Sequence, residues 1–184
     1  MHEVRFHGRG GQGAVTSAEL LAHAAIAEGK SAQAFPSFGP ERRGAPVIAF
    51  ARVADQRIRL RTAIQEPTLV IVLDPSLLRL VKVDQGLRET GTVVLNSSKS
   101  AEEIRETFGF RSRLAVLDAN HIAREEIGRV ITNTTMLGAG IAAVNMVPSE
   151  RVEHALEERF GRIAAKNISA FKRAQAEVTI LEAV

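Results

Sequence analysis

The sequence predicts an α/β fold: a single Rossmann-like, doubly wound and mainly parallel sheet with helices on both faces and a β-hairpin insertion. Short apolar, β-prone runs alternate with segments that carry apolar residues at helical spacing, the order expected when crossover helices join parallel strands. A glycine-rich turn links the first predicted strand to the first predicted helix, as in nucleotide-binding βαβ units. With 184 residues and no recognisable linker, one domain spanning 1–184 is expected.

The N-terminal segment has the pattern strand, turn, helix, strand. Glu3 to His7 is short and β-prone, and Ala14 to Ala27 carries small and apolar residues at helical spacing. Gly29 is a helix stop, and Ser31 to Phe35 forms a second strand. These elements predict a complete βαβ unit.

A β-hairpin is predicted next, with Val47 to Val53 and Arg57 to Arg61 as its arms. Strand side chains alternate, so the arginines of the second arm would share one cationic face. The sequence leaves two interpretations of this face open: a solvated outer surface, or a contact with another subunit or a polyanion.

Three continuous apolar runs predict buried parallel strands, namely Thr68 to Leu73, Thr92 to Leu95 and Leu114 to Leu117. Polar residues follow the runs, namely Asp74, Asn96 and Asp118, and they line the edge at which doubly wound sheets bind ligands. Helices are expected at Ser76 to Val83, Ser100 to Thr107, His121 to Ile127 and Thr134 to Met146, and from about Ser149 and Ala164. The small residues from Gly138 to Ala143 suit either a subunit contact or tight packing on the sheet.

The turn after the first strand has the G-x-G-x-x-G spacing, with glycines at Gly8, Gly10 and Gly13. Glycine tolerates positive φ and close approach, and the helix N-terminus favours an anion, so a phosphate or carboxylate is expected there. A dinucleotide site also needs an acidic residue at the end of the second strand. The nearest acid is Glu41, beside Arg42 and Arg43, which suit phosphate equally well, so ordinary NAD binding is disfavoured.

Composition excludes several kinds of function. Without cysteine, the chain cannot hold a cysteine-ligated iron-sulfur cluster, so any redox centre must lie on a partner. A formal charge of +3 and only 4% aromatic residues do not predict a nucleic-acid partner. Neither a signal peptide nor a transmembrane-length apolar run is evident, so a cytoplasmic protein without a membrane partner is expected. The histidines lack metal-ligand spacing, and no catalytic residue or metal site is predicted.

Longer motifs resemble a known family. They are the runs Arg5 to Val15, Ala34 to Val47, Ile58 to Arg61, Val72 to Pro75, Asn133 to Ala139 and Lys166 to Phe171. In this order they closely resemble the gamma subunit of pyruvate:ferredoxin oxidoreductase and related 2-oxoacid oxidoreductases. The sequence from Glu41 to Pro46 is similar to the pyruvate or ketoisovalerate type.

The resemblance implies a subunit of an enzyme that decarboxylates a 2-oxoacid on thiamine diphosphate, passes electrons through 4Fe-4S clusters to ferredoxin, and transfers the acyl group to coenzyme A. It places thiamine diphosphate, Mg²⁺ and the clusters on alpha, beta and delta-type subunits, and leaves this chain with no bound cofactor of its own. It associates this chain with coenzyme A as substrate. The implied coenzyme A contacts are Gly8, Arg9, Gly10, Gly11, Gln12, Gly13, Ser37, Glu41, Arg42, Arg43, Gly44 and Asn133.

Two alternatives remain open from the residues themselves. One is a free-standing Rossmann-like protein whose loop binds NAD or a mononucleotide. The other is a purely structural subunit in which the glycine loop is only a tight turn.

Overall fold

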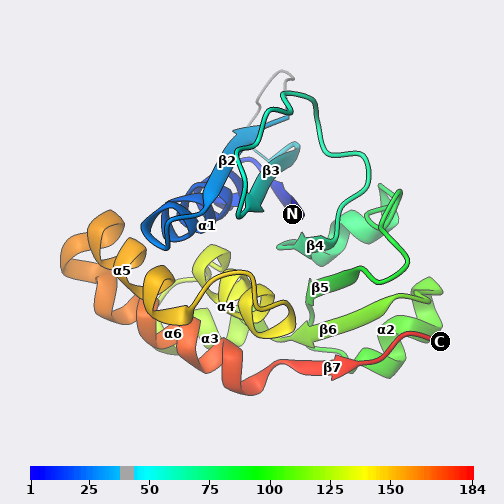
Figure 1. Cartoon of the computed structure of the whole chain (residues 1–184). Coiled ribbons are helices and arrows are strands. Elements are labelled where there is room, and N and C mark those ends of the chain that lie inside the picture. Colours follow the sequence, from blue (N-terminus) through cyan, green and yellow to red (C-terminus); the bar gives the residue numbers. More distant parts are fainter. Residues whose placement is uncertain (38–43) are drawn as a thin grey trace.

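Seven strands form one sheet in the computed structural model, which describes residues 1–37 and 44–184 (Figure 1). The strands are β1 (His2–Arg9), β2 (Ser31–Pro36), β3 (Pro46–Ala54), β4 (Leu69–Val72), β5 (Thr92–Asn96), β6 (Arg113–Leu117) and β7 (Thr179–Leu181). Their order is β2-β3-β1-β4-β5-β6-β7. β1, β4, β5 and β6 are parallel neighbours, whereas β3 and β7 are antiparallel to theirs. Because β1 and β2 both run opposite to β3, five strands share one direction, which confirms the mainly parallel sheet.

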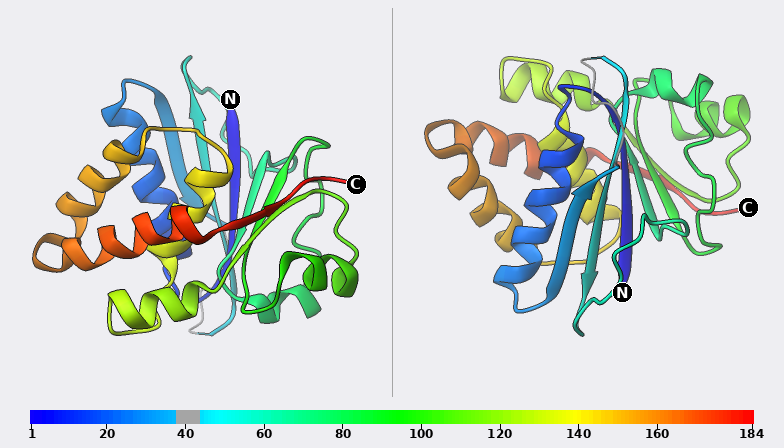
Figure 2. Two further views of the ribbon diagram at one scale, coloured as in Figure 1. Left: turned by 90° about the horizontal axis from the view of Figure 1, so that it is seen from below. Right: turned by 90° about the horizontal axis from the view of Figure 1, so that it is seen from above.

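Helices cover both faces of the sheet, as predicted. They are α1 (Ala14–Ala27), α2 (Ala101–Phe108), α3 (Ala119–Glu126), α4 (Asn133–Ala143), α5 (Ser149–Phe160) and α6 (Ala164–Glu177), with the 3₁₀ helices η1 (Pro75–Arg79) and η2 (Gly161–Ile163). Figure 2 shows α1 and α3 to α6 on one side and α2 with η1 on the other. Among the helices of the described segments, none has the length and apolarity needed to cross a membrane.

The central strands are buried from both sides because each face has its own apolar core. On β4, Leu69 and Ile71 pack into the core beneath α1 and α4 to α6, whereas Val70 and Val72 pack into the core beneath α2. All four side chains are fully buried. This explains why the strand is a continuous apolar run in the sequence, without polar alternation.

The predicted hairpin is wrong in its second arm. Arg57 to Arg61 is not a strand, because β3 is already paired with β1 along one edge and with β2 along the other. β2 and β3 are instead the consecutive antiparallel strands, joined across residues 37–45. β3 lies between β1 and β2 in the sheet, so the two strands of the expected βαβ unit are not neighbours. The arginines at 57, 59 and 61 are exposed on an irregular segment and form no sheet face.

The helix predicted over Ser76 to Val83 is also wrong beyond its first turn, since η1 ends at Arg79. The chain then turns so that the carbonyls of Val83 and Gln85 accept hydrogen bonds from the Arg5 guanidinium, at 2.8 and 2.6 Å. The short strand β7 has no counterpart among the predicted elements. The other predicted strands and helices are present within a few residues of their expected bounds.

The small residues of α4 serve internal packing. A Cβ at Gly138 would lie 2.3 Å from the backbone oxygen of Phe171 on α6. On the sheet side, a Cβ at Gly140 would lie 2.6 Å from Cδ1 of Ile71. Helix α4 is thus wedged between α6 and the sheet, which accounts for its two glycines.

Candidate functional site

The glycine loop forms the carboxyl end of β1 and the start of α1. Strand β1 continues through Gly8 and Arg9, so the turn itself begins at Gly10, whose N–H donates to the Ala45 carbonyl at 2.9 Å. Gly11 and Gly13 have positive φ values of 91° and 82°. Gly13 is the N-cap residue of α1, and no side chain caps this helix. The first-turn N–H groups therefore lack the acceptor that a capping side chain would supply and favour an anion.

Asn133, the first residue of α4, forms the floor of the loop. A Cβ at Gly13 would lie only 2.8 Å from Asn133 Nδ2. The Asn133 backbone oxygen accepts a hydrogen bond from Ser17 Oγ at 3.2 Å, which ties α4 to α1. Asn133 is 4% exposed, and its Oδ1 has no hydrogen-bond partner among the described residues. Two residues far apart in sequence are thus packed together at one helix N-terminus.

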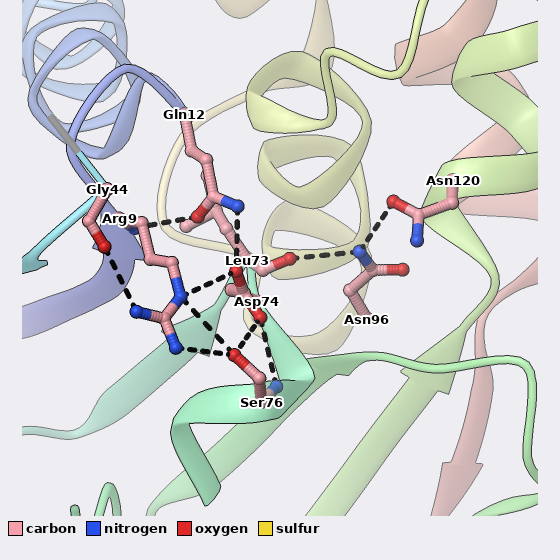
Figure 3. Close-up of polar contacts among 8 residues, drawn as sticks. All are labelled: Arg9, Gln12, Gly44, Leu73, Asp74, Ser76, Asn96 and Asn120. Atoms are coloured by element: carbon pink, nitrogen blue, oxygen red, sulfur yellow. Dashed lines mark hydrogen bonds and ion pairs between the residues drawn. The ribbon is translucent and has the colours of Figure 1, made fainter. Parts of the chain in front are cut away.

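A polar network connects the loop to the end of β4 (Figure 3). Gln12 Oε1 accepts from the Arg9 backbone N–H at 2.6 Å, and Gln12 Nε2 donates to Asp74 Oδ2 at 2.8 Å. Arg9 Nε lies 3.2 Å from the same carboxylate oxygen, and the Arg9 guanidinium also donates to Ser76 Oγ and to the Gly44 carbonyl. Arg9 is therefore held by internal partners.

Asp74 also caps η1, because its Oδ1 accepts from the Ser76 backbone N–H at 2.9 Å. Partial burial acts to raise the pKa of Asp74, but hydrogen bonds from Ser76 and Gln12 and the charge of Arg9 outweigh burial and lower it. Asp74 is thus ionised at neutral pH and satisfied by its neighbours. That arrangement fits a positioning role and offers no free base.

A second amide network joins the ends of β4 and β5 to the start of α3. Asn96 Nδ2 donates to the Leu73 carbonyl at 2.9 Å and to Asn120 Oδ1 at 3.1 Å (Figure 3). Asn96 Oδ1 accepts from the Ala119 N–H at 3.0 Å. Asn96 is 2% exposed, so this side chain locks β4, β5 and the start of α3 in place.

These elements enclose a cleft of about 320 Å³ at the carboxyl edge of the parallel strands. Its lining residues are Gly11, Gln12, Leu73, Asp74, Pro75, Asn96, Asn120, Val130, Ile131 and Thr132. The uncapped start of α1 adjoins this cleft. A crevice at the carboxyl ends of parallel strands is the usual ligand position in an open α/β sheet.

The structure brings some predicted site residues together and separates others. Gly8 to Gly13, Gly44 and Asn133 gather around the loop. Ser37 does not join them. Its N–H donates to the carbonyl of Ile48 on β3, and Ile48 pairs with His7 on the other side of that strand. Ser37 therefore lies two strand spacings from His7, or about 10 Å. Glu41, Arg42 and Arg43 lie outside the described residues.

Sequence reasoning missed part of the cleft lining. Asn120 and Thr132 became site residues only through the packing of α3 and α4 against the strand ends. Val130 and Ile131 are 54% and 44% exposed, and no motif marked this apolar pair at the cleft. Asn96 carried a signal, since it was one of the polar residues at the predicted strand ends.

His7 precedes the loop but is directed into the protein. It is 4% exposed, and its Nε2 has no partner among the described residues. Burial, followed by the charge of Arg5, lowers the pKa of His7 to about 4. His7 is therefore a neutral, buried imidazole that packs at the strand end.

The sequence of the chain matches a known family of proteins over nearly its whole length. A family model described as pyruvate ferredoxin/flavodoxin oxidoreductase matches residues 3–177. The chain belongs to this family. It is 51% identical to the common gamma subunit of pyruvate/ketoisovalerate oxidoreductases from Pyrococcus abyssi, over 99% of this chain and 100% of that one. It is 46% identical to the pyruvate synthase subunit PorC of Methanothermobacter thermautotrophicus, over 97% of this chain and 96% of that one.

A solved structure of the pyruvate oxidoreductase subunit PORC from Thermotoga maritima has the same fold. The TM-score is 0.88 at 39% identity, with 98% of each chain covered. The resemblance to gamma subunits that the sequence motifs predicted is therefore confirmed, and it spans nearly the whole chain.

Proposed function

We propose that this chain is the gamma subunit of a multisubunit 2-oxoacid:ferredoxin oxidoreductase, in which it helps to bind coenzyme A. The observation that carries the proposal is the uncapped N-terminus of α1, which adjoins a cleft at the carboxyl edge of the sheet. Family membership supports the enzyme class, and the cleft supports the proposed role of this subunit within it.

Coenzyme A carries a diphosphate, which suits the glycine loop. The N–H groups of the first turn of α1 donate to phosphate oxygens, and the helix dipole favours their charge. Gly11 and Gly13 keep the main chain free of side chains at the point of approach. Asp74 would repel a phosphate, but Arg9 and Gln12 satisfy its carboxylate.

The reaction is divided between subunits. Thiamine diphosphate, with Mg²⁺, supplies the decarboxylation chemistry, and 4Fe-4S clusters carry the electrons to ferredoxin; we place all of them on alpha, beta and delta-type partners. This division accords with a sequence that contains no cysteine. In this scheme pyruvate, or a related 2-oxoacid, and coenzyme A yield the acyl-coenzyme A and CO₂. The present chain binds and orients one substrate.

A change that introduces a negative charge at the loop tests the proposal in the assembled complex. Gln12→Glu adds a carboxylate beside Asp74 and the expected phosphate position. The apparent KM for coenzyme A should rise at least about tenfold, equivalent to roughly 1.4 kcal/mol, while the KM for the 2-oxoacid stays constant. Gln56→Glu makes the same change at an exposed position after β3 and serves as the matched control. Equal KM values for coenzyme A in the two variants would remove the glycine loop from the coenzyme A site.

A further inference from the structure

A second hollow continues the glycine-loop cleft along the carboxyl edge of the sheet. Its volume is about 490 Å³, and it shares Pro75, Asn96 and Asn120 with the first cleft. Figure 3 shows Asn96 and Asn120 on the side of the network away from Arg9 and Gln12. The two hollows therefore adjoin each other along this edge, from the glycine loop to the ends of β5 and β6, and together we call them the groove.

Three cationic side chains from separate elements line the far part of this groove: Arg79 at the end of η1, Lys99 between β5 and α2, and Arg124 on α3. All three residues are exposed. None of them forms a salt bridge within the described part of the chain, whereas Arg9 at the other end is paired with Asp74. Among the residues that the structure describes, the free positive charge of the groove is thus concentrated away from the glycine loop.

The one acidic residue in this lining already has a structural partner. Asp118 Oδ1 accepts the His121 backbone N–H at 2.9 Å and so caps α3. Serines at 97 and 98 supply hydroxyl groups around the cations. Two arginines and a lysine with nearby hydroxyls match a dianionic phosphate, because guanidinium groups bind phosphate oxygens in pairs.

We propose that Arg79, Lys99 and Arg124 form a second phosphate subsite, which binds a phosphate monoester on the ribose of the ligand whose diphosphate lies at the glycine loop. The inference rests on the proposed function, under which this group is the 3′-phosphate of coenzyme A. The asparagines at the junction then lie beside the ribose. Asn120 Oδ1 already accepts from Asn96, and its Nδ2 donates no hydrogen bond within the described residues, so this amide remains available to a ribose oxygen.

The subsite makes the enzyme select for the phosphate monoester. The test uses the assembled complex with coenzyme A and 3′-dephospho-coenzyme A as paired substrates, and the double variant Arg79→Ala, Arg124→Ala. The KM for coenzyme A should rise about tenfold or more, in line with the loss of charge-assisted hydrogen bonds. The KM for the dephospho compound should change less than about threefold. The ratio of the KM for the dephospho compound to the KM for coenzyme A should therefore fall.

Matched variants separate the subsite from general effects of charge. Arg162→Ala, Lys166→Ala removes the same charge at exposed positions near the start of α6 and should leave both constants unchanged. Arg79→Lys, Arg124→Lys keeps the charge and should restore part of the selectivity. Size-exclusion chromatography of each complex confirms that it has assembled.

The outcomes distinguish the two proposals. An equal rise in KM for both substrates, or no rise for either, in the alanine double variant would overturn the second subsite. Failure of the proposed function has a different signature: Gln12→Glu would then leave both constants unchanged. A rise in the KM for coenzyme A, without a matching rise for the dephospho compound, supports the subsite.

Discussion

Gly13 lies directly against Asn133, so the N-termini of α1 and α4 meet at one point. A Cβ on Gly13 would come within 2.8 Å of Asn133 Nδ2 and 3.0 Å of Asn133 Cβ. Gly13 also has a φ of 82°, which side chains rarely adopt. The glycine is therefore required for two independent reasons, one in its backbone and one in tertiary packing.

Gly13→Ala should destabilise the protein more than the same change at an open position. Positive φ costs about 1 kcal/mol for alanine, and overpacking against Asn133 adds about 1–3 kcal/mol. Gly109→Ala is the matched control, because Gly109 has a φ of 73° and a Cβ at this position would meet nothing within 4 Å. Urea denaturation of both variants measures the difference. If Gly109→Ala costs as much as Gly13→Ala, the Asn133 contact adds nothing.

The sequence was sufficient to predict the glycine loop and the buried parallel strands because both depend on local patterns. Spacing identified Gly8, Gly10 and Gly13, and continuous apolar runs identified strands that are buried on both faces. The position of β3 was not predictable in this way. An alternating run such as Arg57 to Arg61 looks like a strand, yet whether it pairs depends on which sheet edges remain free, and β3 has none.

The cleft was predicted only in part, for a similar reason. Polar residues at strand ends pointed to Asp74 and Asn96, and both lie in its lining. Asn120, Thr132 and Ile131 reach the cleft only after α3 and α4 have packed. The partners of Arg9 were equally hidden, since Asp74 lies 65 residues away in sequence. Long-range packing thus decides which charges remain available to a ligand.

Removing the buried arginine of the ion pair between β1 and β3 should destabilise the protein far more than removing the exposed arginine that shares its carboxylate. Glu3 Oε1 lies 2.9 Å from Arg52 Nε, and Glu3 Oε2 lies 3.2 Å from Arg88 NH2. The side chain of Arg52 is 2% exposed and that of Arg88 is 45% exposed. Arg52→Met leaves the Glu3 carboxylate buried without its main partner and should cost about 3–5 kcal/mol, whereas Arg88→Met should cost less than about 1 kcal/mol.

The double variant Glu3→Gln, Arg52→Met supplies the control for this comparison. It removes the unpaired charge, so it should be more stable than Arg52→Met alone. Chemical denaturation of the single and double variants measures the coupling. If the stability losses of the two single variants add up to the loss of the double variant, Glu3 and Arg52 do not stabilise each other.

The buried imidazole of His7 should make stability fall in mild acid. Its pKa is lowered from an ordinary value of 6.5 to about 4, so between these values the unfolded chain binds a proton that the folded chain does not. Stability is therefore highest above pH 6.5 and is lost as the pH falls toward 4. From this group alone the loss at pH 5 is about 2 kcal/mol, which follows from the two pKa values.

His7→Gln removes the titrating group but keeps a polar side chain of similar size. Urea denaturation at pH 7.5 and pH 5.0 should show a smaller acid-induced loss in this variant than in the wild type. His154→Gln replaces a histidine whose side chain is 57% exposed and controls for the general removal of a histidine. Because the comparison concerns the change with pH, a lower stability of His7→Gln at both pH values does not affect it. The same acid-induced loss in wild type and His7→Gln would show that another group, and not His7, takes up the proton on unfolding.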